Sequence, residues 1–370
     1  MDSEMAVAVI RLEEEHEVLS SAVLNGGHCV TDTLMIMEVP KMYDCSDPLG
    51  HITRIRDELG LPENTVGFMT AAEVADVATL TATDYNGTTT HAVATAGLSN
   101  IVTAGDVITD MDARLERSLK RRSKVGTINI IGIVPFPLSD EGRVNSFIVM
   151  TEAKTAALNS LGYGETGTTS DAIAICSPID GNVVNYTGTG TDVGISLARS
   201  VRDSVRSALI KRNDFKDMGT FLDQLASAGV SRSSIRDAAF ELYIPNPDWD
   251  TDVLKDMFEK KLDVYVKDIN VSSLIQAAIE LDRLGDKDCI CAMERGMFAT
   301  DPIHLVADEM LGMQLAQYIA GTRGIFEFHR FDRHKPGIIG ELGPFLDDII
   351  CGLAGGIMSA IYTELFEVVQ

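Results

Sequence analysis

The chain has 370 residues and carries 31 Lys plus Arg against 55 Asp plus Glu, a formal net charge of −24 at pH 7. This charge excludes nucleic acid and anionic membrane surfaces as expected partners, and a hydrophobic content of 45% excludes a disordered chain. No charged segment followed by an apolar one opens the chain, and its 6 cysteines form no CxxC pair, so we expect reduced thiols and a cytoplasmic protein.

The first part of the chain, to about residue 213, mixes β-branched runs with loops rich in Gly and Thr. Strands are predicted at 34–39, 65–69, 74–82, 88–95, 127–134 and 172–176. Apolar residues at helical spacing predict helices at 144–161 and 194–212. Together these elements indicate an α/β or α+β domain with a mixed sheet.

Four turns rich in Gly, Ser and Thr stand out in this part: LSSAVLNGGH (19–28), TAGLSN (95–100), GETGTTSD (164–171) and YTGTGTD (186–192). Such turns expose backbone N–H groups and hydroxyls to a ligand, although each alone is also an ordinary connection between elements. Their number in one domain predicts a shared pocket. The helical segment TEAKTAAL adds Glu152 and Lys154, either as an acid/base pair at a rim or as an exposed ion pair.

These stretches, together with GFMTAA, GTINIIGIVPFPLSD and TGTGTDVG, resemble the adenosylcobinamide amidohydrolase family over nearly all of residues 18–205. The resemblance implies hydrolysis of the amide that links aminopropanol to the corrin ring of adenosylcobinamide, releasing adenosylcobyric acid. It assigns no nucleophile. The candidate catalytic residues are Ser20, Asn25, Asn100, Glu152, Lys154, Thr168, Asp171 and Thr189.

Two mechanisms remain open for this domain. In the first, Glu152 or Asp171 is the base that activates water, while Lys154 and Asn25 stabilise the oxyanion. In the second, a Thr or Ser hydroxyl is the nucleophile. Alternatively, the domain only binds a corrinoid, as a carrier or sensor, and does not cleave it.

The second part, from residue 218 to the C-terminus, shows helical periodicity almost throughout. Helices are predicted at 250–260, 271–284, 302–319 and 346–369, which indicates an all-α multihelical domain, and the turn IPNPDWD interrupts them. We place the join in KRNDFKDM, giving domains 1–214 and 215–370. The apolar run at 349–362 is short and Gly-rich, which favours a buried helix over a bilayer span, and its small residues would also suit a helical homodimer.

Carboxylates gather in this second part. Asp308 and Glu309 are adjacent, Asp332 precedes Lys335 by three residues, and Asp347 and Asp348 open an apolar helix, where they could also be simple helix-dipole partners. Hard oxygen ligands from several helices suit Mg²⁺ with a bound phosphate, and Lys335 would supply a positive charge for that phosphate.

The motifs DEMLG, FDRHKPG and FLDDIICGLAGG, in this order, are similar to the phosphatidylglycerophosphatase A family. The resemblance implies a Mg²⁺-dependent phosphomonoesterase with Asp308, Glu309, Asp332, Asp347 and Asp348 in its acidic site. The ion would polarise the phosphoryl oxygens and activate water; a covalent aspartyl-phosphate is the alternative. Membrane members carry Trp-Pro after the Lys-Pro pair and have spanning helices, whereas Gly337 and Ile338 follow here, which favours a soluble phosphate over a lipid.

The two resemblances together match a bifunctional archaeal arrangement. In that arrangement the phosphatase half acts on α-ribazole phosphate or on adenosylcobalamin phosphate, so that both activities serve assembly of the nucleotide loop of cobalamin. A phosphatase half that acts on a lipid is the alternative.

Overall fold

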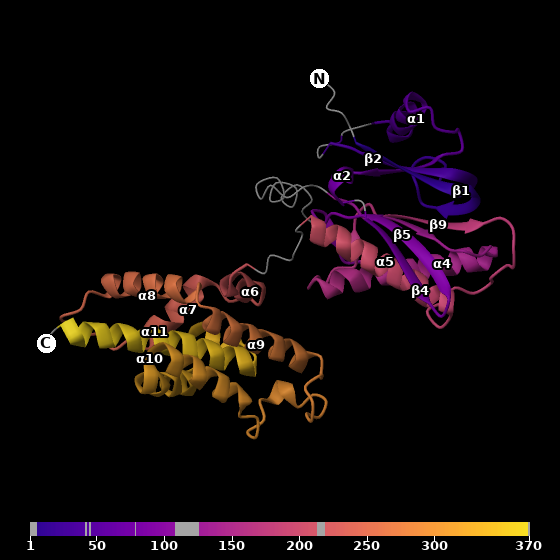
Figure 1. Cartoon of the computed structure of the whole chain (residues 1–370). Helices are drawn as coiled ribbons and strands as arrows, with labels where there is room; N and C mark the ends of the chain where they lie inside the picture. The colour runs from indigo at the N-terminus through magenta and orange to yellow at the C-terminus, as the bar shows by residue number, and fades with distance from the viewer. Residues whose placement is uncertain are drawn as a thin grey trace. The chain divides into compact units, whose positions relative to one another are not determined.

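The computed structural model describes residues 6–40, 43, 46–77, 79–107, 126–212 and 219–368. The chain divides into two compact units, Met1–Lys216 and Asp217–Gln370 (Figure 1). The predicted join lies between residues 214 and 215, outside the described residues.

A seven-stranded mixed sheet organises the first unit. Its strand order is β3-β2-β1-β9-β7-β5-β4, in which the β2–β3 and β7–β9 pairs are parallel and the other pairs are antiparallel. The strands are β1 (Val7–Ser20), β2 (Gly27–Glu38), β3 (Val66–Thr70), β4 (Thr79–Tyr85), β5 (Thr88–Thr95), β7 (Asn129–Ile133) and β9 (Ala172–Pro178). The predicted mixed sheet is confirmed.

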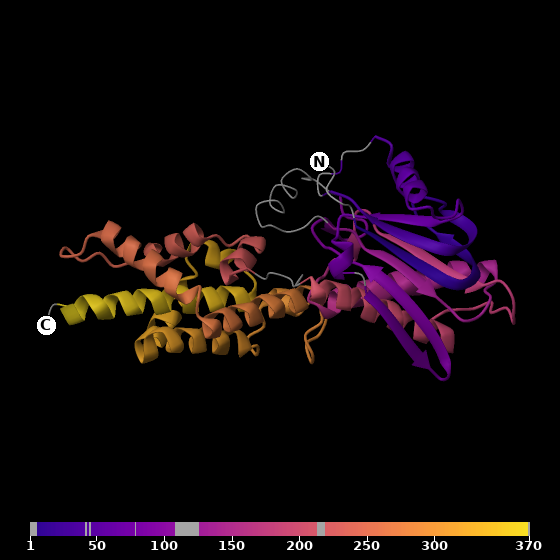
Figure 2. The same ribbon diagram turned by 45° about the horizontal axis from the view of Figure 1, so that its top comes forward.

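Helices α4 (Asp140–Ser160) and α5 (Asp192–Lys211) lie side by side on one face of this sheet (Figure 2). Their apolar sides, including Met150, Ala157, Leu197 and Val201, pack on the alanines and isoleucines of β5, β7 and β9. Helix α1 (Pro48–Glu58) packs through Ile52 on β2. A separate short ladder joins β6 (Ile101–Val102) to β8 (Gly167–Thr168).

One local prediction for this unit is wrong, and one strand was missed. Residues 74–82, predicted as one strand, form the short helix α2 (Val74–Val77) followed by β4, and the Glu38 carboxylate accepts the N–H of Val74 at the start of that helix. The long strand β1 was not predicted, because four glutamates interrupt its apolar pattern and its register shifts between Arg11 and His16.

The second unit is helical, as predicted. Its α-helices are α6 (Phe221–Ser227), α7 (Arg232–Glu241), α8 (Thr251–Tyr265), α9 (Ile269–Asp286), α10 (Ala307–His334) and α11 (Pro344–Val368), with short 3₁₀ turns η1 (Phe298–Thr300) and η2 (Gly337–Glu341). Helix α11 supplies the largest share of the buried apolar core.

Helix α10 is in fact a hairpin of two helical arms. The backbone leaves helical geometry at Ala320 and Gly321, where Gly321 has φ 61° and ψ −149°. A Cβ on Gly324 would lie 2.2 Å from the carbonyl oxygen of Ala316, and a Cβ on Gly312 would lie 2.4 Å from the ring of Phe328. These contacts show that the two arms run antiparallel, so the first and last turns of α10 lie close together. The predicted helix at 302–319 corresponds to the first arm only.

Small residues let α11 pack closely on both arms. A Cβ on Gly352 would lie 2.3 Å from the carbonyl oxygen of Gly312, and Gly355 and Gly356 meet Glu327 and Ile319 in the same way. Residues 344–366 form a helix long and apolar enough to cross a membrane by length and composition, but 67% of its most apolar window is buried inside the unit. The small residues that would suit a homodimer are therefore used in packing within the chain.

Candidate functional site

Three of the four polar turns meet at one edge of the sheet. Asn129, at the start of β7, pairs with Ala172 at the start of β9 and with Thr95 at the end of β5. The turns at 95–100 and 164–171 therefore lie together. The end of β1 joins them, since the N–H of Ser21 donates to the carbonyl of Ile173.

A buried ion pair between Lys154 and Asp171 lies at the centre of this edge. Lys154 reaches in from α4 and donates to Asp171 Oδ2 at 2.5 Å, and only 9% and 11% of the two side chains are exposed. Asp171 also accepts the N–H of Ile128, the N–H of Thr168 and the hydroxyl of Thr168. Both carboxylate oxygens thus accept hydrogen bonds from the protein.

Gly167 permits this pair to form. A Cβ at Gly167 would lie 2.4 Å from Asp171 Oδ2 and 2.5 Å from Lys154 Nζ. Glycine is therefore needed here for space, not for an unusual backbone conformation.

A polar rim covers the ion pair. The amide of Asn100 donates to Thr169 Oγ1 at 2.7 Å, and the Ser170 hydroxyl donates to Thr127 Oγ1 at 2.9 Å. Among the described residues, Asn100 Oδ1 is buried without a hydrogen-bond partner. A buried acceptor of this kind is available to a ligand's N–H or O–H group.

Sequence reasoning missed several members of this cluster. Thr127 and Ser170 bond each other, and Glu165 Oε2 is a further buried oxygen without a partner in the described part of the chain. All three residues lie within or beside the motifs GTINIIGIV and GETGTTSD, but pattern alone did not say which hydroxyls face one another.

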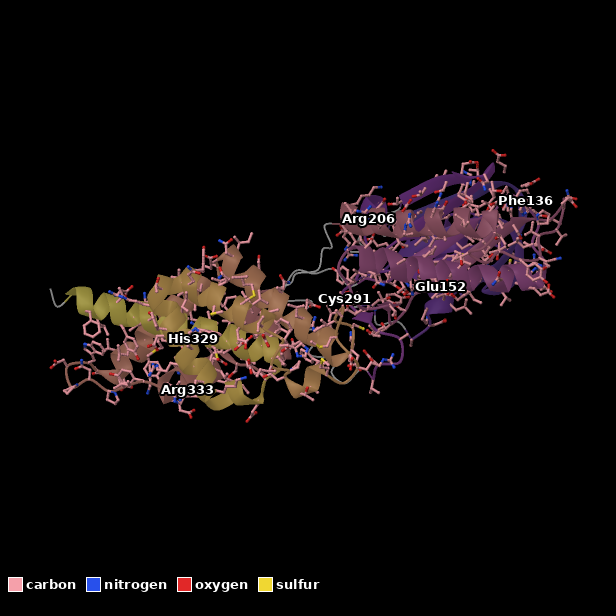
Figure 3. The ribbon with its side chains drawn as sticks, turned by 90° about the horizontal axis from the view of Figure 1, so that it is seen from below. Phe136, Glu152, Arg206, Cys291, His329 and Arg333 are labelled. Atoms are coloured by element: carbon pink, nitrogen blue, oxygen red, sulfur yellow. The ribbon has the colours of Figure 1, made fainter. Side chains whose placement is uncertain are left out.

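Other predicted residues take less central places. Ser20 is buried at the end of β1. Both amide hydrogens of Asn25 go to the carbonyls of Glu63 and Thr65, so none is left for an oxyanion. Glu152 lies on the exposed side of α4 (Figure 3), away from the buried side that carries Lys154. Among the described residues Lys154 therefore pairs with Asp171 and not with Glu152, as expected for residues two apart on a helix, which point to different sides.

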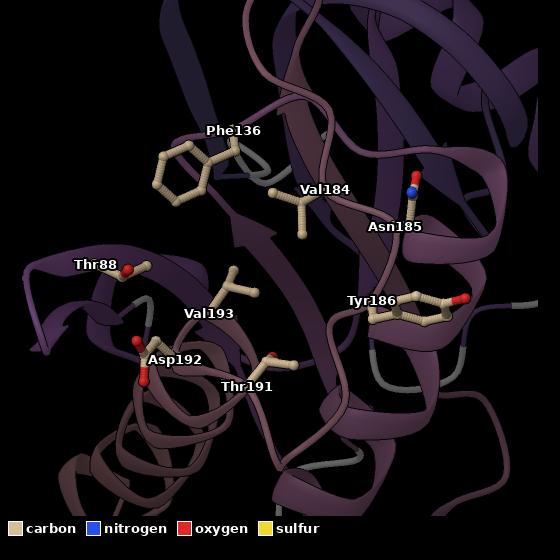
Figure 4. Close-up of a pocket in the computed structure, with 8 residues that line it drawn as sticks. All are labelled: Thr88, Phe136, Val184, Asn185, Tyr186, Thr191, Asp192 and Val193. Atoms are coloured by element: carbon tan, nitrogen blue, oxygen red, sulfur yellow. The ribbon is translucent and has the colours of Figure 1, made fainter.

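Thr189 lies apart from this cluster. Its turn leads into α5, and Asp192 at the start of α5 accepts a hydrogen bond from Asn86 in the β4–β5 turn, at the opposite end of β5 from Thr95. The turn at 186–192 borders a separate pocket of about 390 Å³. This pocket lies between Phe136 and Val184 on one side and Thr88 and Thr191 on the other (Figure 4).

The second unit brings carboxylates together at the open end of the α10 hairpin. Ligand oxygens of Asp308, Glu309 and Asp348 all lie within 4.8 Å of one another. The hairpin returns Asp332 to the same end, where its charge acts on Asp347 and Asp348. Asp347 itself forms an ion pair with Lys335.

Burial and crowding raise the pKa of these acids. Burial, followed by the charges of Asp347, Asp332, Asp308 and Glu309, raises the pKa of Asp348 to about 9. Burial and the neighbouring Glu309 raise the pKa of Asp308 to about 7. Burial raises the pKa of Asp347 to about 6, and the hydrogen bond and charge of Lys335 oppose this rise.

Lys335 is held in an unusual backbone conformation. It ends α10 with φ 40°, in the left-handed region that non-glycine residues rarely adopt, and its side chain lies between Asp347 and Asp301. Burial opposes its charge, yet the hydrogen bond and charge of Asp347 hold the pKa of its ammonium above the usual value. Strained conformations of this kind concentrate at functional sites.

The acidic cluster fits a divalent cation. Glu309 Oε2, Asp347 Oδ1 and Asp348 Oδ1 are buried oxygens without a hydrogen-bond partner among the described residues. Uncompensated carboxylates at this depth are costly, and a hard cation with oxygen ligands would relieve the cost.

Comparison with known proteins agrees with this division. Residues 1–217 match the sequence profile described as adenosylcobinamide amidohydrolase. The chain belongs to the adenosylcobinamide amidohydrolase family. Residues 264–363 match the profile described as phosphatidylglycerophosphatase A, so the chain joins an amidohydrolase-family unit to a phosphatase-family unit.

Archaeal relatives of this amidohydrolase-family chain include both named and uncharacterized proteins. An adenosylcobinamide amidohydrolase of Methanosarcina mazei is 26% identical over 55% of this chain and 94% of its own length. A protein of the same description from Halobacterium salinarum is 35% identical over 32% of this chain and half of its own length. An uncharacterized protein of Methanocaldococcus jannaschii is 38% identical over 34% of this chain and 98% of its own length.

Solved structures show weaker similarity. The protein ypjQ of Bacillus subtilis is 25% identical and aligns with 40% of this chain and 94% of its own, with a TM-score of 0.34. The low temperature requirement C protein of Listeria monocytogenes is 21% identical over the same shares, with a TM-score of 0.35.

Proposed function

We propose that the first unit hydrolyses the aminopropanol amide of adenosylcobinamide and that the second unit removes phosphate from α-ribazole phosphate or adenosylcobalamin phosphate with Mg²⁺. The family membership of the chain and the two named archaeal relatives support a corrinoid amide as the first substrate. The profile match over residues 264–363 supports a phosphomonoester as the second.

The observation that carries the amidohydrolase proposal is the hydrogen bond from the Thr168 hydroxyl to Asp171. Because both Asp171 oxygens are already occupied, the geometry favours Thr168 as the nucleophile over a water activated by Asp171. Thr168 Oγ1 attacks the amide carbonyl carbon while its proton passes to Asp171, and Asp171 then protonates the leaving amine as the C–N bond breaks. Water hydrolyses the resulting ester and returns the hydroxyl to Thr168, while Lys154 holds the Asp171 side chain in place through their contact.

Substitutions at Asp171 and Thr168 test this mechanism. We expect Asp171→Asn and Thr168→Ala to lower the rate of aminopropanol release at least about 100-fold, and Thr168→Ser to retain part of it. Glu152→Gln, on the exposed side of the same helix as Lys154, is the matched control and should react normally. Mass spectrometry of quenched reactions should detect the corrinoid ester on the wild type; normal cleavage by Thr168→Ala would rule the nucleophile out.

A carrier or sensor role predicts a different outcome. In that case the wild-type chain would bind adenosylcobinamide stoichiometrically and release no aminopropanol under any condition.

The observation that carries the phosphatase proposal is the close approach of Asp308, Glu309 and Asp348, whose ligand oxygens lie within 4.8 Å of one another and of which Glu309 and Asp348 each keep a buried oxygen without a partner among the described residues. Asp308, Glu309 and Asp348 would hold the ion, which supplies positive charge to the phosphoryl group when bound. Lys335 binds a phosphate oxygen and neutralises charge as the ester breaks. Asp347 orients Lys335 through their ion pair, and Asp332 adds negative charge that favours the cation.

Phosphate release from α-ribazole phosphate, with and without Mg²⁺, tests this half. EDTA should abolish release, and Asp348→Asn should lower it at least about 100-fold in excess Mg²⁺. Activity only on detergent-dispersed phosphatidylglycerophosphate, with none on α-ribazole phosphate, would instead identify a lipid phosphatase.

A further inference from the structure

The helix that carries Asp347 and Asp348 begins without a capping side chain of its own. The first helical hydrogen bond of α11 runs from the N–H of Asp347 to the carbonyl of Gly343, so Gly343 is the N-cap residue and Pro344 follows it. Pro suits this position because it has no N–H to satisfy. The glycine, however, has no side chain to accept the next free N–H groups, which a Ser, Thr, Asp or Asn would normally do.

Asp282 fills this role from another helix. Its carboxylate, near the end of α9, accepts the N–H of Phe345 at 3.0 Å and the N–H of Leu346 at 3.1 Å, one with each oxygen. Only 6% of Asp282 is exposed. A Cβ on Gly343 would lie 2.6 Å from Asp282 Oδ2, so the glycine provides the space for the approach.

The capped residues directly precede the acidic site. Phe345 and Leu346 are followed by Asp347, the partner of Lys335, and by Asp348, a member of the acidic cluster. The bonded N–H groups lie one to three residues before these carboxylates. The cap therefore fixes the position of the first turn of α11 along and around the helix axis, and with it the positions of both carboxylates.

We infer that Asp282 is a positioning residue for the acidic site of the second unit, holding the first turn of α11 so that Asp348 meets Asp308 and Glu309. The inference rests on the proposed metal-dependent phosphatase activity. Asp282 is not among the three residues whose ligand oxygens lie within 4.8 Å of one another, and each of its oxygens accepts a backbone N–H. The neighbouring Arg283 pairs with Glu280, so Asp282 does not serve as an ion-pair partner of that residue.

Mn²⁺ binding, measured by electron paramagnetic resonance of the free ion, tests the inference on the full chain without any phosphate substrate. Asp282→Ala should weaken Mn²⁺ binding about 10- to 100-fold, as substitutions of residues that orient metal ligands commonly do. Asp282→Asn keeps one acceptor oxygen and should fall between Asp282→Ala and the wild type. Asp286→Asn is the matched control: it removes the same charge one turn later on α9, from an exposed side chain, and should bind as the wild type does.

A second readout separates positioning from simple loss of folding. Trp249, the single tryptophan of the chain, stacks on Tyr362 of α11, so its fluorescence reports whether the second unit is folded. Folded Asp282→Asn should need more Mg²⁺ for half-maximal phosphate release, while its substrate KM at saturating Mg²⁺ changes little.

The outcomes are distinct. Wild-type affinity for Mn²⁺ in folded Asp282→Asn and Asp282→Ala would overturn the positioning role. A wild-type chain that binds no Mn²⁺ would instead overturn the proposed metal site. If Asp286→Asn weakened Mn²⁺ binding equally, the effect would come from the loss of a negative charge alone, and the positioning role would also be overturned.

Discussion

Two Lys–Asp pairs, one buried and one with a partly exposed lysine, illustrate how surroundings decide what a residue can do. Asp171 is held by Lys154, by two backbone N–H groups and by a hydroxyl, so both of its oxygens are satisfied. Asp347 is held by Lys335 but keeps Oδ1 without a partner among the described residues. In the mechanisms that we propose, the first pair serves proton transfer with Thr168, and the second orients Lys335 toward a phosphate oxygen.

Gly167→Ala should disrupt the pair of the first unit. The new Cβ would lie against both Asp171 Oδ2 and Lys154 Nζ, and separating a buried ion pair commonly costs about 3–5 kcal/mol. We expect urea unfolding followed by circular dichroism to show a lower midpoint for the first unit, with Trp249 fluorescence of the second unit unchanged. Gly164→Ala, at a position with open space around its Cβ, is the control, and an equal loss there would contradict the explanation.

Asp282 should make the stability of the second unit depend on pH. Burial, opposed by the N–H groups of Phe345 and Leu346, raises its pKa from 3.8 to about 6 in the folded chain. The folded state therefore binds more protons than the unfolded state between about pH 4 and 6, and the unfolding free energy falls as pH rises through this window.

Asp282→Asn removes this titration. The unfolding free energy of the variant minus that of the wild type should therefore be higher at pH 7 than at pH 4.5, by on the order of 1 kcal/mol. Urea unfolding followed by Trp249 fluorescence measures the difference. An unchanged difference between the two pH values would show that Asp282 does not titrate in this range.

At the scale of elements, the α10 hairpin creates the acidic site. A straight helix of 28 residues would place Asp308 and Asp332 about 36 Å apart, since each residue adds 1.5 Å. The reversal at Ala320 and Gly321 returns the second arm along the first. Gly312, Gly324 and Gly352 let the arms and α11 approach within backbone contact.

Gly321→Ala should therefore destabilise the second unit. Its φ of 61° and ψ of −149° lie in a region that is essentially restricted to glycine, at a cost of about 1–3 kcal/mol for other residues. Trp249 fluorescence in urea should show a fall of this size in the unfolding free energy. Gln317→Ala, on the exposed side of the first arm, should leave the midpoint unchanged; a tolerated Gly321→Ala would mean that the hairpin turn is not strained.

At the scale of the whole chain, the net charge of −24 predicts sensitivity to salt. Part of the negative charge is buried in the acidic cluster, and the rest, with few Lys and Arg to balance it, covers the surface. Screening reduces repulsion between like charges that are exposed, and the Debye length falls from about 10 Å at 0.1 M to about 3 Å at 1 M.

Raising KCl from 0.1 to 1 M should therefore increase the urea midpoints of both units. Circular dichroism and Trp249 fluorescence, read on the same samples, follow the two units separately. Midpoints that stay constant or fall with KCl would show that repulsion between surface charges does not limit stability.

The sequence alone determined the two-part organisation, the mixed sheet, the helical second unit and both family resemblances. These depend on local periodicity and on motifs, which a single chain displays directly. It also indicated which acids of the second part belong together, because their motifs are characteristic in combination. It did not reveal β1, whose glutamates and register shift hide its alternation.

Only the tertiary structure decided which side chains meet. In the folded chain Thr189 lies apart from Asp171, and the Asn25 amide donates to two backbone carbonyls. Thr127, Ser170 and Asp282 join the sites only through contacts made in the folded chain. It also showed that the 28 residues of α10 fold back as two arms. The physical reason is that such contacts depend on strand register, on the reversal at Gly321 and on close approaches at glycines. These features join residues far apart along the chain, where periodicity carries no information.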